Sequence, residues 1–157
     1  MKFQQATEST PGLEAAYQVG LQALRAEDRP HINAGNTRSL RGSVDIDAAF
    51  QTIEPHANRW DFAIAYKHAN RTAECVYWVE MHTAADSEVK VVIKKAMWLR
   101  NWLKNTGKLL ANFECDIVWV SSGATSFTLS APQQKQMAQV GLQHRGSVLR
   151  IPDKRGV

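Results

Sequence analysis

The sequence predicts an α/β domain with a central mixed sheet flanked by helices. Two neighbouring segments rich in valine and aromatic residues read as strands, and a longer segment behind them carries apolar residues at helical spacing. Because strands and helices succeed each other along the chain, we expect them to pack as layers of one domain. The length of 157 residues fits a single domain over 1–157, with a polar and flexible segment at 1–10.

The amino-terminal third is predicted to contain one helix and one extended segment. Residues 13–26 follow a Pro-Gly pair, and Leu13, Tyr17 and Leu21 fall near helical spacing, which predicts a helix. Residues 38–47 alternate only in part, so we expect a short strand and then a turn.

The clearest strand signals are at 60–67 and 74–82. In the first segment the large apolar residues share one face, and Asp61 shares the other face with two alanines. The second segment is rich in Val, Tyr and Trp, which favour strands. The short connection between the two predicts an antiparallel hairpin.

A long helix is predicted next, over 86–105. Asp86 or Ser87 can cap its start, and Gly107 lies just past its end as a stop signal. The remaining expected elements are a buried strand at 116–121, a short strand at 127–129, a helix at 132–142 and an edge strand at 148–151.

Composition and charge restrict the possible functions only weakly. The net charge of +4 suits an anionic partner, although an ordinary soluble surface has the same balance. Cys75 and Cys115 lie in strand-like runs without a CxxC motif, so we predict buried reduced thiols, no zinc site and a cytoplasmic location. No apolar stretch approaches the roughly 20 residues that cross a bilayer, so no membrane contact is expected.

Three ionisable residues of the predicted hairpin form the candidate site. Glu80 and His82 are two residues apart and therefore share one face of a strand, and antiparallel pairing brings Asp61 beside them. Two carboxylates suit Mg²⁺ or Mn²⁺, and an imidazole can accept a proton from water. The alternative interpretation is that all three are solvated residues on an open face.

These residues carry a resemblance to a known family. With Asp61 at the start of one strand and Glu80-Met81-His82 at the end of the next, the segment 13–121 resembles the PD-(D/E)XK nuclease superfamily, whose restriction-endonuclease-like core runs helix, three strands, helix, strand (αβββαβ). The resemblance implies metal ligation by Asp61 and Glu80. His82 stands where that family usually has a lysine, so Lys90 on the following helix is the candidate replacement.

Further residues are candidates for the same site. The family often adds an acidic residue from its first helix, which here would be Glu14, with Glu27 behind it. Asp45 and Asp47 are an additional acidic pair, although capping or turn roles suit Asp47 equally. The candidate nucleic-acid contacts are basic residues before the site and along the long helix, principally Arg38, Arg41 and Lys94.

The sequence therefore supports two hypotheses. The first is an Mg²⁺- or Mn²⁺-dependent nuclease that acts on DNA, with Asp61, Glu80, His82 and Lys90 as catalytic residues. A domain this small often needs a second copy to cut both strands, so a homodimer is expected. The second is a catalytically inactive binding or interaction module that keeps the nuclease-like sheet, which the histidine at position 82 favours.

Overall fold

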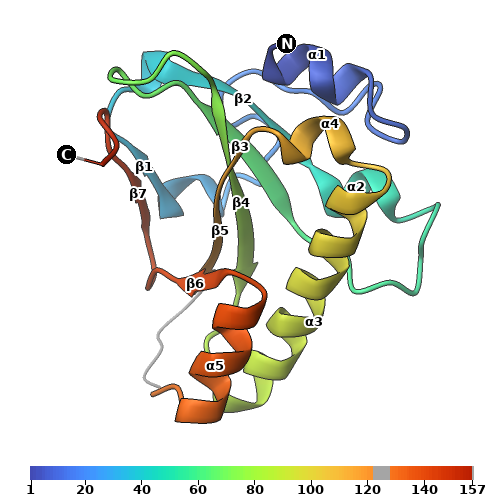
Figure 1. Cartoon of the computed structure of the whole chain (residues 1–157), viewed down its shortest axis with the longest axis vertical. Coiled ribbons are helices and arrows are strands. Elements are labelled where there is room, and N and C mark those ends of the chain that lie inside the picture. Colours follow the sequence, from blue (N-terminus) through green and yellow to red (C-terminus); the bar gives the residue numbers. More distant parts are fainter. Residues whose placement is uncertain (122–127, 157) are drawn as a thin grey trace.

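The computed structural model describes residues 1–121 and 128–156, with only the backbone described at Glu114. A five-stranded mixed sheet in the order β2-β3-β4-β5-β6 forms its centre (Figure 1). β2 pairs with β3 and β3 with β4 antiparallel, whereas β4, β5 and β6 run parallel. The strands are β2 (Leu40–Asp45), β3 (Phe62–Tyr66), β4 (Cys75–His82), β5 (Glu114–Ser121) and β6 (Leu142–His144). The predicted α/β class with a mixed sheet is confirmed.

The register of the hairpin β3–β4 positions the candidate site. Phe62 pairs with Val79, so the preceding Asp61 lies opposite Glu80. Both faces of this hairpin are buried. A one-residue slip would move every side chain of a strand to the opposite face, so the side-chain pattern fixes the pairing. The proximity of Asp61 and Glu80 that the sequence predicted is therefore a direct result of strand pairing.

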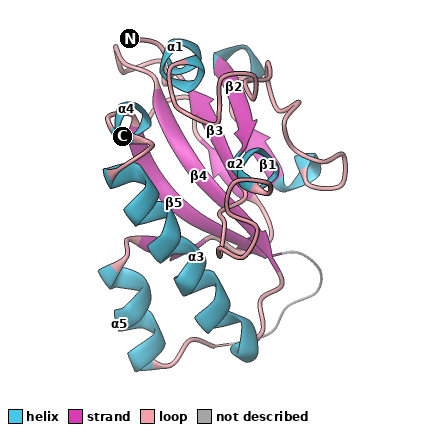
Figure 2. Cartoon of the chain, turned by 90° about the vertical axis from the view of Figure 1, so that its right-hand side faces the viewer, coloured by secondary structure: helices cyan, strands magenta, loops and turns pink. Residues whose placement is uncertain are grey.

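Helix α3 (Asp86–Lys104) connects β4 to the parallel strand β5 and covers one face of the sheet (Figures 1 and 2). Its buried stripe packs with Ala63 and Ala65 of β3 and with Trp78 of β4. The two alanines leave room for the helix to approach the sheet. The stripe consists of Val89, Val92, Ile93, Ala96, Leu99, Trp102 and Leu103.

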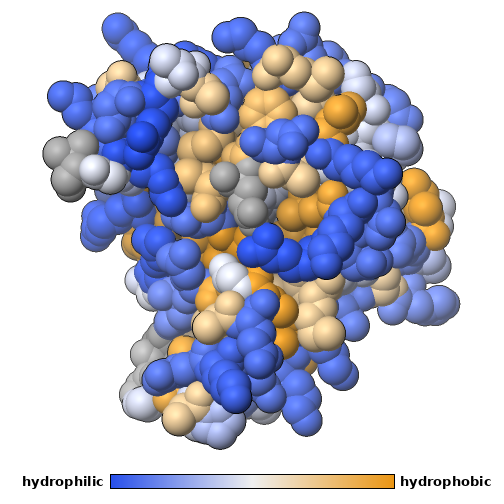
Figure 3. All heavy atoms as spheres, viewed as in Figure 1, coloured by the Kyte–Doolittle hydropathy of each residue, from blue (hydrophilic) through white to orange (hydrophobic). Residues whose placement is uncertain are grey.

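A second, two-stranded sheet covers the opposite face. It pairs β1 (Ile32–Ala34) parallel with β7 (Leu149–Ile151), on the left in Figure 1. Its side chains pack with Phe62, Ile64 and Tyr66 of β3 as a second apolar cluster. The edge strand expected at 148–151 therefore exists, but in a sheet of its own. On the face seen in Figure 3, apolar side chains gather over the middle of the molecule and hydrophilic ones surround them.

Shorter elements complete the chain. The predicted carboxy-terminal helix is α5 (Ala131–Gln139), with Ser130 as its cap. The strand expected at 127–129 begins outside the described residues, and Thr128 and Leu129 are not in a strand. The other short helices are α1 (Phe3–Glu8), α2 (Ile46–Phe50), α4 (Lys108–Ala111) and two 3-10 turns, Arg29–His31 and Thr37–Ser39. Within the described part of the chain, each helix falls short of the length or apolarity needed to cross a bilayer.

The helix predicted at 13–26 is wrong. This segment forms successive turns, and Gln18 instead exchanges two backbone hydrogen bonds with Ser43 of β2, at 3.0 and 2.8 Å. Leu13 and Leu24 are both buried, but in the two different apolar clusters on opposite faces of the sheet. The segment passes the edge of the sheet and places one leucine in the apolar cluster on each face, so the leucine spacing does not reflect a helix.

The segment 1–10, which the sequence predicted to be flexible, contains the helix α1. Phe3 and Ala6 of α1 are fully buried in the main core. The backbone N–H of Phe3 donates to Glu74 Oε1 at 2.7 Å, which ties α1 to the segment before β4.

Replacing Phe3 by Ala is therefore expected to lower the free energy of unfolding by about 3–5 kcal/mol, because a fully buried aromatic ring is removed. Urea denaturation followed by circular dichroism measures the loss. Val19→Ala, at a side chain 66% exposed, is the control and should change stability by less than about 0.5 kcal/mol. An unchanged stability of Phe3→Ala would show that α1 does not dock on the core.

Candidate functional site

Asp61 and Glu80 meet where β3 begins and β4 approaches its end. The backbone N–H of Asp61 donates to Glu80 Oε1 at 3.2 Å, and the N–H of Met81 donates to Asp61 Oδ2 at 2.9 Å. Glu80 is fully buried and Asp61 is 8% exposed. The interpretation of these residues as solvated side chains on an open face is therefore wrong.

The cation that reaches these carboxylates is Lys95 of α3. Its Nζ lies 2.6 Å from Glu80 Oε2, and its side chain is 20% exposed. Lys95 follows the buried Val92 by three positions and precedes the buried Leu99 by four, so it lies along the edge of the helix stripe that faces the sheet. The helix therefore directs the amine toward the strand that carries Glu80.

His82 joins the cluster from the end of β4. Its Nδ1 lies 3.6 Å from Glu80 Oε2, and its Nε2 lies 2.8 Å from Glu88 Oε2 in the first turn of α3. The hydrogen bond to Glu80 raises the pKa of His82 most, and the bond to Glu88 adds to it against the effect of burial. This environment favours a protonated imidazole, so His82 is better suited to donate a proton than to accept one.

The titration of the cluster reflects two buried acids that lie side by side. Burial first, and the charge of Glu80 second, raise the pKa of Asp61 to about 8, although Lys95 opposes the shift. Burial lowers the pKa of Lys95, but Glu80 and Asp61 outweigh it and leave the pKa raised. Two carboxylates thus share one lysine, and their oxygens are the donor type that Mg²⁺ and Mn²⁺ prefer. The donor set fits such an ion.

The additional acidic candidates have local roles. Asp45 caps α2 by accepting the N–H of Ala48 at 2.8 Å. Asp47 pairs with Arg59 at 2.9 Å. The start of α2 adjoins the site through its backbone, because the Ile46 N–H donates to the carbonyl oxygen of Asp61 at 2.8 Å.

Glu14 is not brought to the site by a first helix, because that helix does not form. It is exposed and accepts a hydrogen bond from the N–H of Gly12. Glu27 is likewise exposed and lies 3.9 Å from Arg25.

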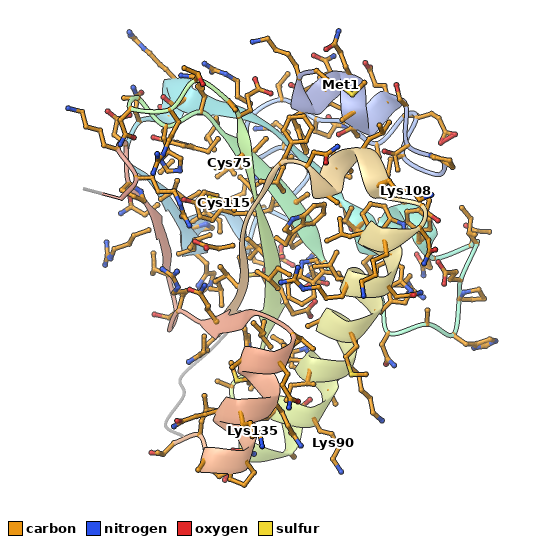
Figure 4. All side chains as sticks on the ribbon, viewed as in Figure 1. Met1, Cys75, Lys90, Lys108, Cys115 and Lys135 are labelled. Atoms are coloured by element: carbon orange, nitrogen blue, oxygen red, sulfur yellow. The ribbon has the colours of Figure 1, made fainter. Side chains whose placement is uncertain are left out.

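The structure places the other basic candidates away from the carboxylates. Lys90 is exposed near the amino-terminal end of α3 (Figure 4). It lines a pocket there with Gln133 and Gln136 of α5. The basic side chain that α3 supplies to the carboxylates is thus Lys95 rather than Lys90. Lys94 is exposed on the same helix.

Arg38 and Arg41 lie at the opposite end of the sheet. Leu40, between them, pairs with Tyr66, which in turn pairs with Cys75, the first residue of β4. That position is five residues from Glu80, roughly 16 Å along a strand. Arg41 there pairs with Glu74 at 3.5 Å.

Lys95 and Glu88 are the site residues that the sequence alone did not single out. The signal for Lys95 was its position next to the apolar stripe of the helix, which Lys90 and Lys94 lack. Glu88 gave no comparable signal, because an acidic residue in the first turn of a helix is ordinary.

Comparison with protein-family models, curated proteins and solved structures finds no match to this chain. The arguments for its chemistry are therefore those of the site itself.

Lys95→Met is expected to lower the free energy of unfolding by about 3 kcal/mol, because it leaves Glu80 buried without its cation. Chemical denaturation measures the change, and Lys94→Met, an exposed neighbour, should stay within about 0.5 kcal/mol of the wild type. Adding Glu80→Gln to Lys95→Met should recover part of the loss, since the two residues interact directly. Equal effects of the two lysine substitutions would contradict the buried pair.

Proposed function

We propose that this chain is a divalent-metal-dependent nuclease that hydrolyses phosphodiester bonds in DNA, built on a restriction-endonuclease-like core. The observation that carries the proposal is the convergence of Asp61, Glu80 and Lys95 from two strands and a helix. The element order supports it: between β2 and β5 the chain forms three antiparallel strands, the helix α3 and a parallel strand, with the short helices α2 and α4 inserted. Asp61 just before β3 and Glu80 near the end of β4 support the resemblance to the PD-(D/E)XK superfamily.

The residues divide the work as follows. Asp61 and Glu80 would hold Mg²⁺ or Mn²⁺ through carboxylate oxygens, and such an ion activates water and neutralises charge on the scissile phosphate. Lys95 takes the part that the family gives to the lysine of its triplet: it orients Glu80 and places a positive charge beside the phosphate. His82, held between Glu80 and Glu88, can protonate a leaving oxygen.

DNA is the proposed substrate class, and a homodimer the proposed assembly. The net charge of +4 suits a polyanion, and the exposed amines of Lys90 and Lys94 can contact phosphates along α3. A second copy would supply the second cut of a duplex. The two free thiols, Cys75 and Cys115, suit a reducing compartment such as the cytoplasm.

One observation favours the alternative of a catalytically inactive binding module. Glu80 is fully buried, and both its oxygens already bond within the protein, to the Asp61 N–H and to Lys95. Metal ligation by Glu80 therefore requires Lys95 or the carboxylate to shift when the ion enters.

A cleavage assay separates the two functions. Incubated with plasmid and with single-stranded DNA, the wild type should cut only with Mn²⁺ or Mg²⁺ and not with EDTA. Asp61→Asn and Glu80→Gln should abolish cutting. Lys95→Met should slow it by roughly 10²–10³-fold, the usual effect of losing one group that stabilises transition-state charge.

Lys104→Met, at another exposed lysine of α3 and purified in the same way, is the matched control and should retain the wild-type rate within a few-fold. Circular dichroism checks that each variant is folded. DNA cleavage that persists in Asp61→Asn would contradict the assignment of the active site. DNA binding without cleavage in either ion would establish the inactive module instead.

A further inference from the structure

A second cluster of ligand-type side chains lies at the other end of β4. One ring nitrogen of His68 and the Sγ atoms of Cys75 and Cys115 lie within 4.8 Å of one another. Figure 4 shows the two cysteines close together on β4 and β5. Both are free thiols and partly exposed, not buried as the sequence predicted, and His68 is 1% exposed. The expectation of no zinc site rested on motif spacing, which cannot detect a cluster brought together by folding.

A bulge between β4 and β5 creates this cluster. Val76 pairs with Glu114 but Tyr77 pairs with Asp116, so Cys115 is an extra residue on its strand. Strict alternation would place Cys115 with Ile117 on the α3 face. Instead it packs with the second apolar cluster, on the face that also holds Cys75 and Tyr77. The bulge thus turns one thiol toward the other.

The imidazole of His68 is held with one nitrogen toward the thiols. Its Nδ1 lies 2.8 Å from the carbonyl oxygen of Pro152, which can only accept, so Nδ1 carries the proton. Its Nε2 is then an acceptor and bonds the hydroxyl of Tyr77 at 2.9 Å. A backbone carbonyl that fixes Nδ1–H and leaves Nε2 as the nitrogen with a lone pair is the usual support of a metal-binding histidine.

We propose that His68, Cys75 and Cys115 form a zinc site. Two thiolates and an imidazole are a zinc donor set, and such three-ligand sites leave a fourth position for water or another molecule. Tetrahedral zinc requires ligand atoms about 3.5–3.8 Å apart, so the side chains close by about 1 Å around the ion. The proposal is independent of the nuclease site, which lies near the other end of β4.

Charge and access around the cluster agree with a bound cation. Asp116 accepts two hydrogen bonds from Arg155, each at 3.0 Å, and Arg145 lies 3.5 Å from the same carboxylate. Two thiolates would balance the charge of one Zn²⁺. A pocket of about 360 Å³, lined by both cysteines, Arg71, Asn112 and Arg155, adjoins the site.

The test is metal binding by the reduced, untagged chain. Co²⁺ should produce thiolate-to-cobalt charge-transfer absorption, Zn²⁺ should displace it, and native mass spectrometry should show one zinc per chain. Losing a residue that only supports a ligand costs 10–100-fold in affinity, so Cys75→Ser, Cys115→Ser and His68→Asn should each weaken zinc binding by roughly 100-fold or more. Thr72→Ala, at an exposed residue of the same pocket, should bind zinc as the wild type does.

Two further measurements test the site without substituting a proposed ligand, so they remain informative if the ligand variants fold poorly. In the wild type, Zn²⁺ should slow the reaction of both thiols with Ellman's reagent, and EDTA should restore the rate. Tyr77→Phe removes the hydroxyl that occupies Nε2 of His68 and should retain zinc binding or strengthen it. Loss of zinc binding in Tyr77→Phe would overturn the ligand set.

Unprotected thiols and absent cobalt absorption would overturn the proposal outright. A chain that forms a Cys75–Cys115 disulfide under mild oxidation, yet shows no affinity for zinc when reduced, would also overturn it and identify a redox pair in its place.

Discussion

The buried carboxylate of Glu80 is the constraint on which the rest of the structure depends. It is fully excluded from solvent, and an unpaired charge there would cost several kcal/mol. Two groups bond to it. The Asp61 N–H reaches Glu80 only in the observed register of the β3–β4 hairpin. The Lys95 amine reaches it only when α3 is rotated so that Lys95 lies toward the sheet. One side chain thereby couples strand pairing to helix orientation.

The alternation of β4 separates two chemical environments. Glu80 meets α3 together with Asp61 and Lys95, where oxygen ligands and charges gather. Cys75, five residues earlier, faces the small second sheet and His68, where sulfur and nitrogen ligands gather. Hard cations prefer the first set and borderline cations such as zinc the second. A single strand can therefore present two sites that do not compete for the same ion.

Local periodicity explains which features the sequence could predict. The hairpin, α3 and β5 follow from patterns within one segment, and the meeting of Asp61 with Glu80 follows from the hairpin alone. The failures depend on distant partners. Turns replace the helix at 13–26 because Gln18 bonds Ser43 of β2. Lys95 rather than Lys90 reaches the carboxylates because of how α3 lies against the sheet, and the bulge at Cys115 is an offset between two strands far apart in sequence.

The charged residues of the buried cluster are better explained by a functional role than by a contribution to the stability of the fold. A buried ion pair stabilises a fold little more than well-packed apolar residues of the same volume, so stability alone gives no reason for Glu80 and Lys95. Asp61 makes the cluster more costly still, because burial first, and the charge of Glu80 second, raise its pKa to about 8. Groups whose burial and charge oppose folding concentrate where a protein binds or reacts. A cation that pairs with both carboxylates would remove this cost, which makes the site more stable when it is occupied by its ligand.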